Sequence, residues 1–146
     1  MTYALIAVAA LMFGLYNVFI KLSADHIQAV LGAVVLQFVA AFMGLAWLAW
    51  LHLGQGQALT HSPRGLTLAA MAGIAIGLVE ILTFVVYGRG LPVAVGNPLI
   101  IGGSLLVTTG VGVVLLREAL SPVQLAAVGL IGLGIAAFAW EAARQG

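Results

Sequence analysis

Glu80 is the residue whose type and position most directly suggest chemistry. It lies in LVEILTFVVYGRG, Leu78–Gly90, where every residue between it and Arg89 is uncharged. A carboxyl group near the middle of a membrane-spanning helix costs about 2.5–3.5 kcal/mol on insertion scales, and such acids are functional by default. A bound proton or cation offsets the cost of burying the charge. We expect Glu80 to bind a proton or cation on a translocation pathway; the alternative is a structural hydrogen bond to Asn17, Asn97 or a backbone carbonyl.

The other polar residues of the apolar stretches share helical faces with small or aromatic residues. Side chains spaced i, i+3/i+4 and i+7 lie on one face of a helix. On this spacing Glu80 aligns with Gly73 and Gly77, and Gln37 aligns with Ala33 and Trp47. Faces that contact lipid are expected to carry Leu, Ile and Val, so these faces are predicted to point inward. The predicted substrate- or proton-binding residues are Glu80, Asn17, Asn97, Gln37, Ser104 and Thr108, with Tyr16 and Tyr87 able to cap a cation through their rings.

A proline inside the fourth apolar stretch is a second unusual feature. In GNPLIIGG, Pro98 removes the amide that would bond to the carbonyl of Ala94. A freed carbonyl beside the amide of Asn97 suits the wall of a cavity. A kink that serves only packing explains the proline alone equally well.

Glycines on the last two stretches predict close helix packing. Gly129 and Gly132 form a small-residue face that has no polar group before Trp140, and Gly103 and Gly110 are similar. Such faces let two helix backbones approach closely in a membrane. The contact can lie within one protomer or between the protomers of a dimer.

Composition indicates the elements that hold these residues. The chain has 146 residues, of which 64% are hydrophobic and only 6% charged, so it is expected to be an integral membrane protein. A helix needs about 20 apolar residues to cross the bilayer core. The sequence therefore predicts an all-α, polytopic protein of the inner (plasma) membrane, in which residues 1–146 form a single unit. Its five transmembrane helices are predicted at Thr2–Ile20, Ile27–Leu51, Leu66–Tyr87, Leu91–Leu116 and Pro122–Ala143.

Several classes of function have no support in the sequence. There is no cysteine, and the three histidines share no spacing typical of metal ligands. No nucleophile–base pair or phosphate-binding glycine loop is present. The net charge of +1 gives no basic cluster for nucleic acid. We therefore predict no cofactor, no metal site, no enzyme activity and no nucleic-acid partner.

The distribution of positive charge gives almost no preferred orientation. With five spans, Arg64 and Arg117 lie on one side of the membrane, and Lys21, Arg89 and Arg144 lie on the other. Cytoplasmic loops normally carry an excess of Lys and Arg. A balance of two against three fits either one weakly specified orientation or dual topology, in which copies insert both ways and pair head to tail.

Two segments of the chain resemble a known transporter family. ALMFGLYNVFIKLSA resembles the opening of an EamA-type domain, the five-helix unit of the drug/metabolite transporter superfamily. The segment from Tyr87 to Ile135 resembles the closing half of that domain, most clearly in LLREALSPVQLAAVGLIGLGI, Leu115–Ile135. Most members carry two such units in tandem. The four-helix small multidrug resistance proteins of this superfamily form antiparallel dimers around a membrane-embedded glutamate in their first helix, where this chain has Asn17.

This resemblance implies a secondary transporter of a small polar or cationic metabolite or drug. A lone five-helix unit can reproduce an inverted repeat only by pairing with an oppositely inserted copy, so we expect an antiparallel homodimer with a midplane cavity and proton coupling. One alternative is a non-transporting membrane subunit that assembles with an enzyme or flippase. Another is half of a heterodimeric transporter.

Overall fold

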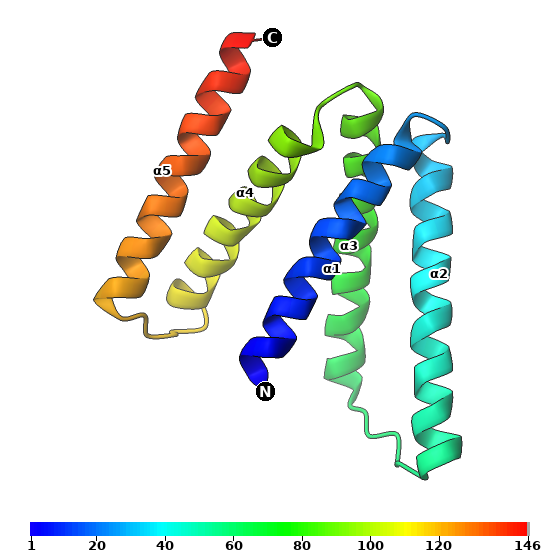
Figure 1. Ribbon diagram of the computed structural model, residues 1–146. Helices are drawn as coiled ribbons and strands as arrows, with labels where there is room; N and C mark the ends of the chain where they lie inside the picture. Colours follow the sequence, from blue (N-terminus) through cyan, green and yellow to red (C-terminus); the bar gives the residue numbers. More distant parts are fainter. Residues whose placement is uncertain (146) are drawn as a thin grey trace. The chain divides into compact units, whose positions relative to one another are not determined.

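The structure, a computed structural model, describes residues 1–145 of the chain and contains helices and turns in that range. Figure 1 shows five long helices: α1 (Thr2–Ala24), α2 (Ala29–Ala49), α3 (Pro63–Gly88), α4 (Val93–Val114) and α5 (Pro122–Gln145). A π-helical turn, η1 (Trp50–Gly54), extends α2. Each of the five is long and apolar enough to cross a membrane. The predicted all-α protein with five transmembrane helices is confirmed.

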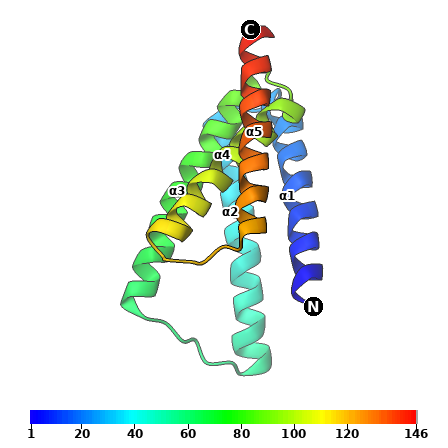
Figure 2. The same cartoon turned by 90° about the vertical axis from the view of Figure 1, so that its left-hand side faces the viewer.

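The chain divides into two compact units, which we describe separately. The first covers Met1–Gly90 and the second begins at Leu91. In the first unit, α2 packs against α3, and α1 packs against both. Figures 1 and 2 show α1 running beside α3 with α2 adjacent. This three-helix arrangement contains Glu80, which lies on α3.

The contact between α2 and α3 depends on a missing side chain. Gly32 of α2 is buried, and a Cβ atom added there would lie 2.5 Å from Cε1 of Phe84 on α3. Phe84 is only 3% exposed, and Ala33 beside Gly32 is fully buried. The two helices can therefore approach closely at this level because residue 32 has no side chain.

The end of α3 is held by α1. Lys21 Nζ donates a hydrogen bond of 3.0 Å to the carbonyl oxygen of Tyr87 and lies 3.6 Å from Asp25 Oδ1. The amide of Gly90 donates to the same carbonyl, and Gly90 has φ 93°, a conformation that glycine adopts without strain. Lys21 thus satisfies a carbonyl at the helix terminus and also bears a charge favourable to that terminus.

In the second unit, α4 and α5 pack along each other. A Cβ atom added at Gly102 of α4 would collide with the side chain of Ile135 on α5, and one added at Gly132 of α5 would lie 3.5 Å from Leu106. The start of α5 is capped: Ser121 Oγ accepts from the amide of Gln124 at 3.2 Å. The Gln124 side chain accepts from the amide of Ser121 at 2.8 Å, which completes a capping box.

Most helix boundaries differ by a few residues from those expected. α3 begins at Pro63 rather than Leu66, because Ser62 caps it by accepting from the amide of Gly65 at 3.1 Å. α1 continues to Ala24 and includes the segment KLSA, whereas the predicted span ended at Ile20. α2 ends at Ala49, and the π-helical turn carries the chain on to Gly54.

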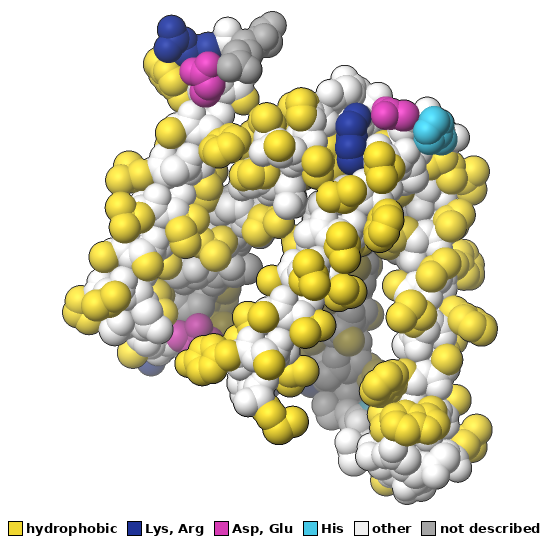
Figure 3. Space-filling view, viewed as in Figure 1, with side chains coloured by type: hydrophobic (Ala, Val, Ile, Leu, Met, Phe, Trp, Pro, Cys, Tyr) yellow, Lys and Arg dark blue, Asp and Glu magenta, His cyan; other side chains and the backbone are white. Residues whose placement is uncertain are grey.

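The surface fits a membrane environment. Figure 3 shows hydrophobic side chains along the flanks of the helices, with charged side chains near helix ends. Phe38, Phe42 and Trp47 of α2, for example, are 73%, 74% and 65% exposed. Large apolar side chains that remain exposed along a helix of this length suit contact with lipid or with other membrane helices.

Candidate functional site

Glu80 lies in a groove formed by α1, α2 and α3. The groove has a volume of about 560 Å³, and its polar lining residues are Tyr16, Gln37 and Glu80. Its other lining residues are Phe13, Leu36, Val39, Ala40, Met43, Gly73 and Ile76. No Lys, Arg or His is among the lining residues, so the carboxyl of Glu80 faces an apolar space that contains no cation of the protein.

The carboxyl of Glu80 is incompletely bonded. Glu80 is only 2% exposed, and its Oε2 atom is buried without a hydrogen-bond partner among the described residues. Tyr16, on α1, lines the same groove as Glu80. A buried polar atom without a partner is rare in proteins and calls for a ligand, an ion or water. The carboxyl is therefore placed to accept a ligand from the groove.

The side chain of Gln37, on α2, contacts α3 at Gly77, which is about one helical turn before Glu80. A Cβ atom added at Gly77 would lie 3.5 Å from Gln37 Nε2 and 3.6 Å from Oε1, so the amide of Gln37 rests against this glycine. Since residues 77 and 80 lie on one helical face, Gln37 adds a neutral donor and acceptor to the surroundings of the acid.

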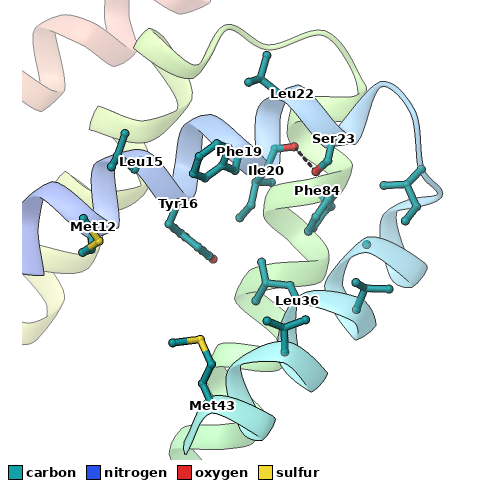
Figure 4. Close-up of a pocket in the computed structure, with 14 residues that line it drawn as sticks. Met12, Leu15, Tyr16, Phe19, Ile20, Leu22, Ser23, Leu36, Met43 and Phe84 are labelled. Carbon is teal, nitrogen blue, oxygen red and sulfur yellow. Dashed lines mark hydrogen bonds between the residues drawn. The ribbon is translucent and has the colours of Figure 1, made fainter.

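A larger apolar groove adjoins the first. It has a volume of about 940 Å³, lies between α1 and α2, and reaches Phe84 of α3. Both grooves are lined by Tyr16, Leu36, Val39 and Met43, so they are continuous. Figure 4 shows Tyr16 projecting from α1 toward α2 and α3, with Met43, Leu36 and Phe84 around the same space. Together the grooves form a single concave surface that carries an acid in one part.

Two other predicted residues of the first unit are buried, but neither lines these grooves. Asn17 is 4% exposed, and its side-chain amide donates to the carbonyl of Phe13 at 2.9 Å. Tyr87 is fully buried, and its hydroxyl has no hydrogen-bond partner in the part of the chain that the structure describes. Whether Tyr87 caps a cation through its ring stays a prediction.

The predicted inward face of α2 is correct only in part. Ala33 is fully buried and Gln37 is half-buried, but Trp47 on the same face is 65% exposed. Trp47 packs edge-on against Trp50, with 5.5 Å between the ring centroids. The spacing predicted one inward face for the whole helix, whereas only its first half lies against the neighbouring helices.

The remaining predicted polar residues belong to α4 in the second unit. Ser104 and Thr108 are exposed, and their hydroxyls donate to carbonyls of their own helix at 2.8 and 2.9 Å. Asn97 is half-buried, and its Oδ1 atom has no partner among residues 1–145. α4 continues through Pro98 as one helix. Whether these residues bind substrate stays a prediction.

The glycines predicted for packing have different surroundings. Gly132 contacts Leu106 within the chain, whereas added Cβ atoms at Gly103, Gly110 and Gly129 would meet nothing within 4 Å. The closest glycine contact between α4 and α5 involves Gly102, which was not among the glycines predicted for packing. Neighbouring glycines on one helix cannot be ranked from sequence, because the partner side chain, here Ile135, determines which of them is needed.

Sequence reasoning also missed the apolar part of the site. Phe13, Leu36 and Met43 line the groove around Glu80 but were not selected from the sequence, and leucine was expected on the faces that contact lipid. Thr83, one turn from Glu80, is 4% exposed and was not selected either. Its i+3 spacing from the acid is the signal that could have identified it.

The described residues contain no group of three or more His, Asp or Glu side chains that could hold a metal ion. No protein-family model, curated protein or solved structure matches the chain. The function must therefore be argued from the geometry around Glu80.

Proposed function

We propose that the chain is a secondary transporter of the EamA type that exchanges protons for a small organic cation across the inner membrane. The observation that carries this proposal is the carboxyl of Glu80: this residue is buried on a membrane-long helix, lines a groove, and has one oxygen without a hydrogen-bond partner among the described residues. Acids placed in this way within membrane helices commonly belong to ion or proton pathways.

The surroundings of Glu80 favour exchange over permanent binding. No cationic side chain lines the groove, so the carboxyl has no fixed counter-ion there. In a medium of low dielectric constant, a carboxylate gains stability from either a proton or a bound cation. The two ligands therefore compete for one group, and this competition is the minimal requirement for antiport.

The walls of the groove narrow the choice of substrate. Seven of its lining residues are apolar or glycine, and the polar ones are Tyr16, Gln37 and Glu80. Such a lining solvates the apolar part of an organic cation better than a fully polar metabolite. A small organic cation or drug is therefore favoured over the polar metabolite that the sequence analysis also allowed.

We further propose that the working unit is an antiparallel homodimer. Five spans place the termini on opposite sides of the membrane, and the nearly balanced positive charges permit both insertions. Two oppositely oriented copies would reproduce the inverted-repeat plan of many secondary transporters, with substrate held near the midplane. Residues of the second unit, namely Asn97, Ser104 and Thr108, are proposed to complete the cavity in one or both copies.

A flux assay tests the transport proposal. The purified chain is reconstituted into liposomes that contain a pH-sensitive dye, and a gradient of benzyltrimethylammonium is imposed. The wild-type chain should drive proton movement against the cation, and Glu80→Gln should abolish it because an amide cannot exchange a proton. Glu118→Gln, which removes an acid between α4 and α5, serves as the matched control and should retain the flux.

Two outcomes would contradict the transport proposal. Equal fluxes for wild type and Glu80→Gln would reduce Glu80 to a structural residue. No flux from the wild-type chain with any of a series of organic cations would favour a membrane subunit that requires an enzyme, a flippase or a similar unit as its partner.

A further inference from the structure

Buried polar side chains continue along α3 from Glu80 toward the end of the helix. Thr83 is 4% exposed and Tyr87 is fully buried, and the spacing 80, 83, 87 puts all three on one helical face. Asn17 of α1 is also 4% exposed. None of Asn17, Thr83 and Tyr87 lines either groove. We call Glu80, Thr83, Tyr87 and Asn17 the buried polar strip; it shares only Glu80 with the grooves.

The contact between α1 and α3 places Asn17 level with this face. Lys21 Nζ donates to the carbonyl oxygen of Tyr87 at 3.0 Å, near the ends of both helices. Figure 1 shows the two helices side by side and running in the same direction. Both rise about 1.5 Å per residue, so the residues four positions before this contact, Asn17 and Thr83, lie at about the same level. The strip therefore draws on both helices and leads to Lys21.

Polar atoms at the two ends of the strip have no partner. Glu80 Oε2 and Tyr87 Oη are both buried without a hydrogen-bond partner among residues 1–145. Such an atom in apolar surroundings costs free energy unless it is hydrogen-bonded. A buried water molecule typically bonds to polar groups of this kind, and it can donate to the carboxylate as well as to the hydroxyl. The unpartnered atoms therefore point to bound water at both ends of the strip.

We propose that water bound along the buried polar strip carries protons between Glu80 and the ends of α1 and α3. The carboxyl of Glu80 gives its proton to an adjacent water molecule. Each further water molecule or hydroxyl accepts one proton and donates another, as the hydroxyls of Thr83 and Tyr87 are able to do. The last proton is released beside Lys21 and Asp25, whose side chains are 22% and 56% exposed.

This inference rests on the proposed function and gives the proton a route of its own. The organic cation is proposed to reach the carboxyl of Glu80 through the groove, whereas the strip approaches Glu80 along α3 from the end marked by Lys21. Chains of polar groups within membrane helices commonly serve as proton relays. Separate routes allow a proton to leave the carboxyl while the cation occupies the groove.

The strip contains no charged side chain besides Glu80. α2 contributes no titratable residue. On α1 and α3 the titratable residues other than Glu80 are Tyr3, Tyr16, Lys21, Arg64 and Tyr87. Tyr16 lines the groove, and Lys21 is engaged with the Tyr87 carbonyl and with Asp25. Proton transfer along the strip therefore depends on neutral hydroxyls and water, and substitution can remove each hydroxyl separately.

The rate of proton release tests this inference. The full chain in lipid nanodiscs is mixed rapidly with benzyltrimethylammonium in the presence of a pH-sensitive dye. Tyr87→Phe keeps the ring and loses only the hydroxyl, and it should slow proton release about tenfold because the relay loses one member. Thr83→Val should slow release in the same way. The affinity for benzyltrimethylammonium, measured by calorimetry at equilibrium, should stay unchanged in both variants because neither residue lines a groove.

Tyr3→Phe is the matched control. It removes a hydroxyl from an 88% exposed tyrosine of α1 and should change neither the rate nor the affinity. A wild-type rate in Tyr87→Phe or in Thr83→Val, while Glu80→Gln abolishes release, would overturn the proton route alone. A loss of affinity that matches the loss of rate would overturn it too, since a structural role would then explain both. No proton release from the wild-type chain, or equal release from Glu80→Gln, would instead overturn the proposed function.

Discussion

Gly32 of α2 lies directly against the ring of Phe84 of α3. Hypothetical Cβ contacts at Gly32 would be 2.5, 2.8 and 2.9 Å from three carbons of that ring, closer than real Cβ atoms pack. Both residues also line the larger groove, so this contact fixes the wall of the site as well as the spacing of the helices. Because residue 32 has no Cβ atom, the Phe84 ring can pack against the backbone of α2, and this contact sets the distance between α2 and α3.

The variant Gly32→Ala should destabilise the protein. The added methyl group must displace an aromatic ring that is 3% exposed, and overpacking of this kind costs about 1–3 kcal/mol. Alanine favours a helix over glycine by about 1 kcal/mol, which offsets part of that loss. Gly44→Ala in the same helix, where a Cβ atom meets nothing within 4 Å, is the control and should be neutral or stabilising. Thermal unfolding in detergent compares the two variants; a Gly32→Ala protein as stable as Gly44→Ala would show that this contact is unimportant.

The proposed antiparallel homodimer predicts dual topology, which the nearly balanced positive charges permit. A population of chains with one insertion would place the C-terminus on one side of the membrane, whereas the proposed antiparallel dimer requires both. Fusing one reporter active only in the cytoplasm and another active only outside it to the C-terminus should give signal from both fusions. Adding two lysines to the loop between α2 and α3 should shift the signal strongly to one reporter, because cationic loops stay cytoplasmic.

Signal from one reporter only in the unaltered chain would rule out dual topology. The transport proposal would then require a parallel dimer or a partner of opposite orientation. The assignment of Glu80 would remain testable by itself, because its groove is formed within one protomer.

The helices could be predicted because their signals are local. Long apolar runs identified all five helices. The third predicted span began at Leu66, although Ser62 and Pro63 together form a cap-and-proline signal for a helix start. The boundaries that failed are those where a charged but helix-compatible segment, such as the one that contains Lys21, continues a helix beyond the apolar run.

The site could be predicted only in part because it depends on packing among three helices. Glu80 was identified from the energetic cost of placing an acid in lipid. Gln37 was identified because it shares a helical face with small and aromatic residues. The proximity of Tyr16 to the acid has no local signal, since the two residues lie on different helices. The larger groove that adjoins theirs is lined by Gly32, and nothing in the sequence indicates which aromatic ring this glycine meets.

The central claim is that Glu80 takes up and releases a proton within the membrane. Infrared difference spectroscopy measures this directly, because a protonated carboxyl gives a carbonyl band that a carboxylate lacks. Wild-type protein in nanodiscs should show a carboxyl band that changes with pH and with addition of octyltrimethylammonium, and Glu80→Gln should lack this band. Identical spectra for the wild type and Glu80→Gln would contradict the claim, because no titrating carboxyl could then be assigned to Glu80.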